Sequence, residues 1–333
     1  MTTLFQRRRL FSVATLGAVA VVMLLGAMPR ADAAGEAPKE LRIGFQKSSV
    51  NLTLLKQRKA LEQRLKDVKV SWFEFTAGPQ LLEALSVGSI DFGATGDTPP
   101  IFAQAAGSNL AYVGAEPPKP DNSAILVKQD SPIKTLADLK GKKIALQKGS
   151  SAHYLTMRAV QNSGLQWSDI MPIYLAPADA RAAFERGSVD AWVIWDPYWA
   201  AIEKSVNPRV LATSNGITSN HSYYLASRSY ADKYPGVLQV LFEELTKSDS
   251  LVRDNKAEAV RVIAESTGLD LATIDTYISR RPRSPVVYLT KAMIDEQQEI
   301  ADNFYRQNLI PKSIRIRDVV WYPAPMPAKV NAK

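Results

Sequence analysis

The stretch that decides the fold is Gln147-Lys148-Gly149-Ser150-Ser151-Ala152-His153. It joins a short apolar run, residues 144–146, to a stretch with helical character over residues 151–161. A strand-to-helix turn rich in Gly and Ser leaves several backbone N–H groups free, so it is suited to binding an anion. The same kind of turn occurs earlier, because Ile43-Gly44-Phe45-Gln46-Lys47-Ser48-Ser49 matches residues 144–150 at an offset of 101.

A second pair of matching segments extends this repeat. Gly88-Ser89-Ile90-Asp91 matches Gly187-Ser188-Val189-Asp190 at an offset of 99, and Asp97 matches Asp196 at the same offset. The apolar pattern predicts strands at 41–46, 70–75, 90–94 and 110–113, then at 124–127, 142–146, 170–175 and 189–194. Helices are predicted between them, the first as a single helix over residues 50–66. We therefore predict two similar α/β units of roughly a hundred residues, each with a mostly parallel sheet and helices on both faces.

The connections between the two units are also visible in the sequence. Glu116-Pro117-Pro118-Lys119-Pro120 has too many prolines for a helix or a central strand, which indicates a rigid connector and a hinge. Residues 219–225 have the character of a return crossing, and the remainder is predicted as helices near 235–255, 256–266, 271–279 and 291–307. We predict lobe 1 over residues 40–118 plus 225–333, lobe 2 over residues 119–224, and a cleft between them.

The composition agrees with a globular protein of two lobes. The chain has 333 residues, of which 46% are apolar and 22% charged. Its net charge is +8, and residues 1–33 contribute +3 of this through four Arg and one Asp. The remaining excess of positive charge is spread along the chain without a dense basic run, so we expect no nucleic-acid partner.

The N-terminus has the order of an export signal. Three Arg precede an apolar stretch over residues 10–28, and Ala31-Asp32-Ala33 follows as a cleavage site, so residues 1–33 are predicted to be a signal peptide cleaved after Ala33. A membrane-anchoring helix is the alternative. Arg8-Arg9-Leu10-Phe11 also allows twin-arginine export, which leaves the export route open.

Cysteine is absent from the sequence. An exported chain without Cys has no disulfides, no thiolate metal site and no cysteine nucleophile, and it cannot be tethered through a lipidated Cys. We therefore expect the mature protein to lie free in the periplasm.

The ends of the predicted strands are the natural place for a ligand, because ligands of open α/β sheets bind beyond the carboxyl ends of the strands. These turns offer backbone N–H groups, hydroxyls, an amide and an indole, which suit an oxyanion that only accepts hydrogen bonds. The candidate binding residues are Gln46, Gly78, Gly96, Asp97, Thr98, Gly149, Ser150, Ser151, Trp195 and Asp196.

Several of these residues have a structural alternative. Ser150 and Ser151 can cap the helix that they precede, and the two aspartates are expected first as helix N-caps, because a carboxylate repels an anion. Trp192 is expected in the core. His153 and His221 are isolated, so no metal site and no cofactor are predicted. Nucleotide-binding, metalloprotease and serine-hydrolase motifs are absent from the sequence, which favours binding over catalysis.

Several motifs along the chain form a recognisable set: Thr95-Gly96-Asp97-Thr98-Pro99-Pro100-Ile101, Trp195-Asp196-Pro197-Tyr198 and residues 41–47, 88–91, 112–114, 117–120, 147–151, 177–184 and 309–312. In these segments the chain resembles the periplasmic aliphatic sulfonate-binding proteins of ABC importers. The resemblance implies a two-lobed type II periplasmic binding protein fold with two hinge crossings, in a monomer that captures an alkanesulfonate and delivers it to an ABC permease. It also implies that the sulfonate lies near Gly149-Ser150-Ser151, facing Gln46 and Gly96-Asp97.

Alternatives to this function remain within the same fold. The resemblance is loose at Val50-Asn51-Leu52-Thr53, which leaves the preference for the ligand tail open. A receptor for taurine, nitrate or another small oxyanion is the first alternative. An enzyme on the same fold, such as a pyrimidine-precursor synthase, is disfavoured because it would need a reactive Cys or a His cluster.

Overall fold

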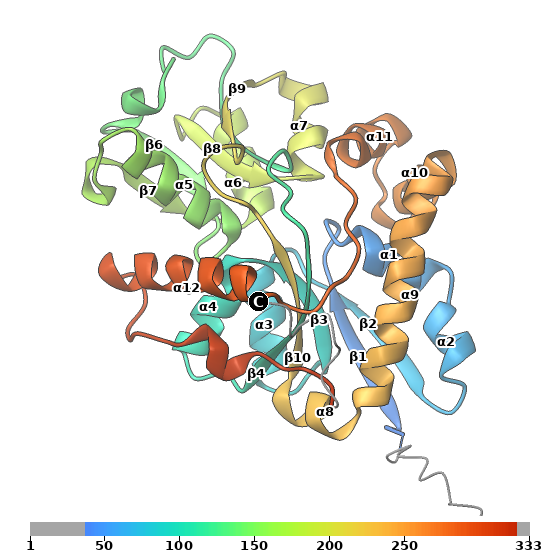
Figure 1. Ribbon diagram of the computed structural model, residues 1–333. Helices are drawn as coiled ribbons and strands as arrows, with labels where there is room; N and C mark the ends of the chain where they lie inside the picture. The colour runs from blue at the N-terminus through green and yellow to red at the C-terminus, as the bar shows by residue number, and fades with distance from the viewer. Residues whose placement is uncertain (1–36, 325–333) are drawn as a thin grey trace, which may run out of the picture. The chain divides into compact units, whose positions relative to one another are not determined.

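The computed structural model describes residues 37–324, so the predicted signal peptide lies outside the described residues. The described chain forms two five-stranded sheets in the orders β2-β1-β3-β10-β4 and β7-β6-β8-β5-β9 (Figure 1). The first contains β1 (Glu40–Phe45), β2 (Lys69–Glu74), β3 (Phe92–Gly96), β4 (Leu110–Glu116) and β10 (Ser222–Ser227); the second contains β5 (Ser123–Val127), β6 (Lys143–Leu146), β7 (Met171–Tyr174), β8 (Ala191–Trp195) and β9 (Arg209–Thr213).

Helices alternate with the strands and then dominate the last third of the chain. They are α1 (Val50–Gln57), α2 (Ala60–Arg64), α3 (Gly78–Ser86), α4 (Thr98–Ala105), α5 (Ser151–Asn162), α6 (Pro177–Glu185), α7 (Tyr198–Val206), α8 (Arg228–Lys233), α9 (Pro235–Asp254), α10 (Lys256–Thr267), α11 (Leu271–Arg280) and α12 (Lys291–Arg306). Three short 3₁₀ helices lie at Leu136–Leu139, Trp167–Asp169 and Ile316–Val319. Within residues 37–324, no helix has the length and apolarity needed to cross a membrane.

The internal repeat has a direct structural counterpart. β1 is parallel to β2 and β3, and β6 is parallel to β7 and β8, while the fourth strand of each sheet, β10 or β5, is antiparallel. Asp91 accepts a hydrogen bond from the Arg42 N–H at 2.9 Å, and Asp190 accepts one from the Lys143 N–H at 2.7 Å. The repeated Gly-Ser-Ile/Val-Asp motif thus ties the third strand to the start of the first strand in both sheets, and the predicted pair of α/β units is confirmed.

Two crossings connect the sheets, one from β4 to β5 and one from β9 to β10, and they run side by side (Figure 1). The Lys119 N–H donates to the Ser219 carbonyl at 3.0 Å, and the Asn220 amide donates to the Lys119 carbonyl at 2.9 Å. Both sheets belong to the same compact unit of the chain. β10 pairs with β3 on one side and with β4 on the other. The lobe boundaries given above, residues 40–118 plus 225–333 and residues 119–224, stay a prediction.

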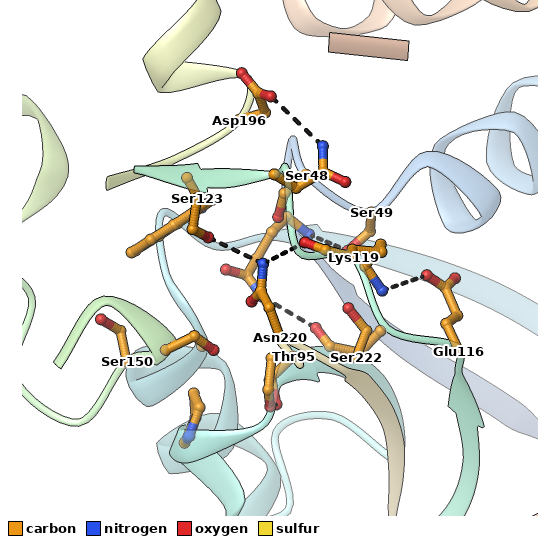
Figure 2. A pocket seen from close by; sticks show the side chains of 18 of the residues that line it. Ser48, Ser49, Thr95, Glu116, Lys119, Ser123, Ser150, Asp196, Asn220 and Ser222 are labelled. Carbon is orange, nitrogen blue, oxygen red and sulfur yellow. Dashed lines mark hydrogen bonds and ion pairs between the residues drawn. The ribbon is translucent and has the colours of Figure 1, made fainter. Parts of the chain in front are cut away.

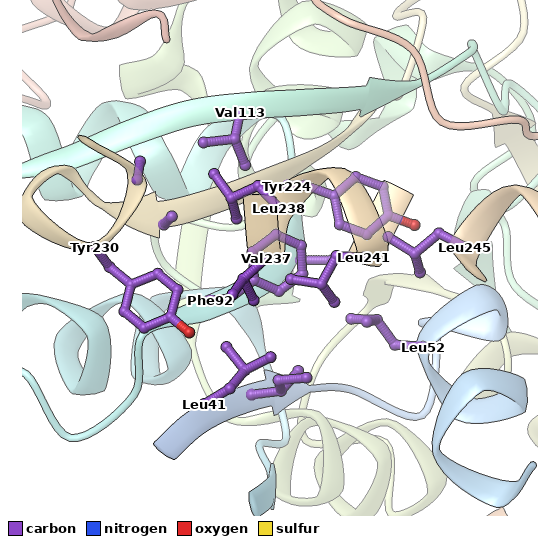
Figure 3. Close-up of a cluster of buried hydrophobic side chains, with 14 of the residues drawn as sticks. Leu41, Leu52, Phe92, Val113, Tyr224, Tyr230, Val237, Leu238, Leu241 and Leu245 are labelled. Atoms are coloured by element: carbon purple, nitrogen blue, oxygen red, sulfur yellow. The ribbon is translucent and has the colours of Figure 1, made fainter. Parts of the chain in front are cut away.

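One large apolar cluster fixes the first sheet against the helices that follow β10. Leu41 and Phe92 from the sheet, Leu52 from α1 and Leu238 and Leu241 from α9 are buried together (Figure 3). In the second sheet Trp192 is fully buried, which confirms its predicted place in the core. Packing of this kind covers the sheets and leaves the turns at the strand ends accessible to a ligand.

The single helix predicted over residues 50–66 is wrong. The structure has two helices, with Lys59 between them in the left-handed region at φ 50°. Leu55 and Leu61 are both fully buried, but six residues at about 100° each would place them on different faces of one continuous helix. The break at Lys59 lets both side chains reach the same core.

Candidate functional site

A cavity lies where the carboxyl ends of β1 and β3 face the carboxyl ends of β6 and β8. Figure 2 shows that its walls come from both sheets and from the two crossings. Most of the lining residues are small, polar or able to donate hydrogen bonds: Gln46, Ser48, Ser49, Gly78, Ala94, Thr95, Gly96, Pro99, Glu116, Lys119, Asn122, Ser123, Ser150, Ser151, Trp195, Asp196, Asn220, Ser222, Tyr224 and Tyr277. The arrangement has room for a polar ligand between two similar sets of strand-to-helix turns.

The start of α5 supplies free donors to this cavity. Ser150 occupies the N-cap position, yet its hydroxyl donates to the Gln147 carbonyl at 2.8 Å and makes no capping bond. Among the described residues, no acceptor is in hydrogen-bonding geometry for the N–H groups of Ser151 and Ala152. Because unpaired N–H groups at a helix N-terminus favour negative charge, this end of α5 is suited to an anion.

Ser151 also brings the two sheets into contact. Its hydroxyl donates to the carboxylate of Asp97, which is almost fully buried, and a Cβ added at Gly96 would lie 2.1 Å from the Ser151 Oγ. Burial raises the pKa of Asp97, while hydrogen bonds from Ser151 and Thr98 act in the opposite direction. Gly96 is therefore required by the close approach of Ser151, and this contact joins the lobes directly.

The prediction that Asp97 caps α4 is wrong. Asp97 occupies the N-cap position, but the residues that would donate to it are Pro99 and Pro100, which have no N–H. Its carboxylate accepts from the Thr98 hydroxyl at 2.9 Å instead. The matching residue Asp196 is not the N-cap either, because Pro197 occupies that position, but its carboxylate accepts a hydrogen bond from the Ala200 N–H in the first turn of α7 at 3.0 Å.

Glu116 and Lys119 place an ion pair on the first crossing, at the cavity wall (Figure 2). Lys119 Nζ lies 3.0 Å from Glu116 Oε2, and Arg281 lies 3.6 Å from the same oxygen. Asn51 and the Tyr224 hydroxyl donate to Glu116 Oε1 at 2.9 and 2.7 Å.

Burial would raise the pKa of Glu116, but Lys119 and Arg281 outweigh it and hold that pKa below its ordinary value. The pKa of Lys119 is itself lowered by burial, against the opposing effect of Glu116. Of the lining residues, only Lys119 carries a positive charge. The carboxylate of Glu116 is already satisfied, so this part of the wall offers a cation to an anionic ligand.

Asp196 is the other carboxylate on the wall, and it too has its own cation. Arg280 lies 3.2 Å from Asp196 Oδ1, and the Asn122 amide donates to Oδ2 at 3.4 Å. Burial raises the pKa of Asp196 to about 6, although Arg280 opposes the shift.

Seven of the ten predicted binding residues line the cavity, namely Gln46, Gly78, Gly96, Ser150, Ser151, Trp195 and Asp196. Three do not. Asp97 and Thr98 are buried just behind the wall, and Gly149 has a φ of +72° and lies against Phe102, lining a separate groove instead. That any of these residues contacts the ligand stays a prediction.

Sequence reasoning missed the lining residues on the crossings and on α11. These are Glu116, Lys119, Asn122, Ser123, Asn220, Ser222, Tyr224 and Tyr277. The prolines around Lys119 predict a connector between the two lobes. Because such a connector borders the cleft, its polar residues could have been predicted to line the cavity. Nothing local in the sequence points to Tyr277, whose hydroxyl donates to the Ser48 carbonyl at 2.5 Å across 229 residues.

Comparisons with known proteins agree with this geometry. The chain matches the NMT1-like family over residues 34–267. It is 47% identical over 311 residues to an Escherichia coli (strain K12) protein named for binding aliphatic sulfonates, covering 93% of this chain and 98% of that protein.

Two solved structures are similar over 86% of this chain. One is the alkanesulfonate-binding protein SsuA from Xanthomonas axonopodis pv. citri bound to MOPS, with 46% identity, a TM-score of 0.83 and 99% of that chain covered. The other is the periplasmic aliphatic sulphonate binding protein SsuA from Escherichia coli, with 48% identity, a TM-score of 0.81 and 94% of that chain covered.

Proposed function

This chain belongs to the NMT1-like family, and from that premise we propose that it is a periplasmic solute-binding protein that captures aliphatic sulfonates for an ABC importer. The observation that carries the proposal is the cavity between the sheets, where the free N–H groups of α5 and the Lys119 ammonium meet several hydroxyls. A sulfonate keeps one negative charge at physiological pH, so it needs donors and no acceptor. The cavity meets this requirement because Glu116 and Asp196 are each already paired with cations.

The proposed role is binding and delivery rather than catalysis. The similar proteins are named as binding proteins, and within residues 37–324 no group of three acidic or histidine side chains could hold a metal ion. Closure of the two lobes around the ligand would present a loaded form to the membrane permease. We propose that permease as the partner of a monomeric binding protein.

We further propose that residues 1–33 direct export and are cleaved near Ala33, which would leave the mature protein in the periplasm. Support comes from the sequence of that segment and from a relative named as periplasmic. Mass spectrometry of the protein secreted to the periplasm checks the cleavage site. A mature N-terminus that retains the apolar stretch would contradict this assignment.

Isothermal titration of the mature protein tests the ligand. We expect one-site binding of ethanesulfonate and butanesulfonate, with taurine, sulfate and nitrate as the competing candidates. Pentanoate is the matched control, since it has a tail of similar length but a planar head with two oxygens. If sulfate or nitrate bound while every sulfonate failed, the function would be that of a different anion receptor.

A further inference from the structure

The last turn of α11 reaches across to the opposite sheet. Arg280 ends α11, and its guanidinium lies 3.2 Å from Asp196 Oδ1 and 2.5 Å from Glu203 Oε2. It also stacks on the Trp199 ring, 3.6 Å from the centroid. Asp196, Trp199 and Glu203 all belong to the segment that follows β8, so one side chain of α11 holds the start of α7 through three separate contacts.

Asp196 is the residue that makes these contacts matter for a ligand. Asp196 is one of the residues that line the cavity, and its side chain has no exposed surface. A buried carboxylate so close to the cavity opposes the entry of an anion. Arg280 is not among the lining residues, so it neutralises Asp196 from behind the wall without occupying space that the ligand needs. The charge at this wall is therefore decided by a side chain that does not itself line the cavity.

We propose that Arg280 is a specificity-determining residue: by pairing with Asp196 across the α7–α11 contact, it makes the cavity accept an anion in the closed form. The proposal rests on the proposed function, because it concerns the same cavity. Arg280 acts through Asp196 and is thus a positioning residue with an electrostatic role.

The residues between α7 and α11 allow this contact to break when the lobes open and to form again when they close. Apart from Arg280, it contains the ion pair of Lys204 with Asp270, both of which are well exposed. Ala200 is the one residue of α7 that belongs to the buried cluster formed by α1, α10 and α11. The contact thus combines ion pairs, the stack of Arg280 on Trp199 and one small apolar side chain, which lobe opening can break at modest cost. When the lobes separate, Asp196 loses its cation, and when they close the carboxylate is neutralised as the ligand becomes enclosed.

Calorimetric titration with butanesulfonate at pH 7.5 tests the proposal in Arg280→Gln, Asp196→Asn and the double variant, each checked for folding by thermal unfolding. We expect Arg280→Gln to weaken binding by about tenfold or more, because it leaves an unneutralised carboxylate at the wall. The double variant is expected to regain affinity to within about threefold of Asp196→Asn alone. Lys204→Gln is the matched control, since it removes an exposed ion pair from the same contact, and it should change affinity by less than about threefold.

A pH series separates charge cancellation from a purely structural effect. The charged and titratable groups that face Asp196 are Arg280 and Tyr277 from α11 and Glu203 from α7. In Arg280→Gln, affinity should rise as the pH falls from 8 to 5.5, since protonation of Asp196 removes the repulsive charge, whereas the double variant should lack this added slope. A double variant as weak as Arg280→Gln, or the same pH slope in both, would overturn the proposal.

The wild-type titration keeps the two proposals apart. If the wild-type protein binds no sulfonate, the proposed function fails, and the variants are then titrated with whichever of sulfate or nitrate the wild type binds. Loss of affinity in Arg280→Gln with rescue by Asp196→Asn would still support the role of Arg280 for that anion.

Discussion

Replacing Gly96 by Ala should interfere with lobe closure more than with folding. An added Cβ would lie 2.1 Å from the Ser151 Oγ and 3.3 Å from the Ser151 Cβ, and a Cβ makes essentially no non-bonded contact shorter than 3.0 Å. Ser151 belongs to the facing sheet's turn, so the clash exists only while the two turns are together. The open form, in which Ser151 has moved away, accommodates the methyl group.

The size of the effect follows from what Ser151 must give up. Its hydroxyl can rotate away from the new methyl group, but it then loses its hydrogen bond to the buried Asp97 carboxylate. A hydrogen bond to a charged group contributes about 1.5–3 kcal/mol, so closure should be disfavoured by that amount and affinity should fall by about tenfold to a hundredfold. The backbone N–H of Ser151 would remain available to the ligand.

Titration with butanesulfonate in the Ser151→Ala background isolates this clash. There the hydroxyl is already absent, so adding Gly96→Ala should cost only a small further loss of affinity. Gly236→Ala at the start of α9 is the control, since a Cβ there meets no atom within 4 Å. The reasoning is refuted if Gly96→Ala weakens binding equally in both backgrounds, or if it lowers the thermal stability of the ligand-free protein as much as it lowers affinity.

Three further changes are predicted. Ser151→Ala should weaken sulfonate binding more than Ser150→Ala, because the Ser151 hydroxyl bonds to Asp97 on the facing turn, whereas the Ser150 hydroxyl donates to the Gln147 carbonyl of its own turn; equal losses by titration would contradict this. Lys119→Met should lower the free energy of unfolding by about 3–5 kcal/mol in denaturant titrations, because it breaks a buried ion pair, and Glu116→Gln in the same chain should recover part of it. Burial lowers the pKa of His153 from its ordinary value of 6.5 to about 3, and its side chain is fully buried. Because the unfolded chain takes up the proton first, stability should fall by about 2 kcal/mol between pH 6.5 and 5. His153→Gln should lose less over that interval, and parallel curves would refute the assignment.

Much of the fold was predictable because its signals are local. The apolar runs that became β1, β3, β6 and β8 alternate with helical stretches, and the repeated Gly-Ser-Ile/Val-Asp motif marks the same backbone bonds in both sheets. The prediction failed at Lys59, where a change of helix direction depends on a core that the local pattern does not show. It failed again at Asp97, although the two prolines that prevent capping are visible in the sequence.

The sequence by itself determined that this chain has two strand-to-helix turns of one kind and a cleft rich in donors between two lobes. It placed Gln46, Ser150 and Trp195 at that cleft because each follows or ends a strand. Only the tertiary structure decided which charges meet there. Arg280 reaches Asp196 across 84 residues, and Arg281 reaches Glu116 across more than a hundred. Pairing between charges so distant in sequence depends on how the helices pack, and that packing makes the cavity suitable for an anion although two carboxylates stand in its wall.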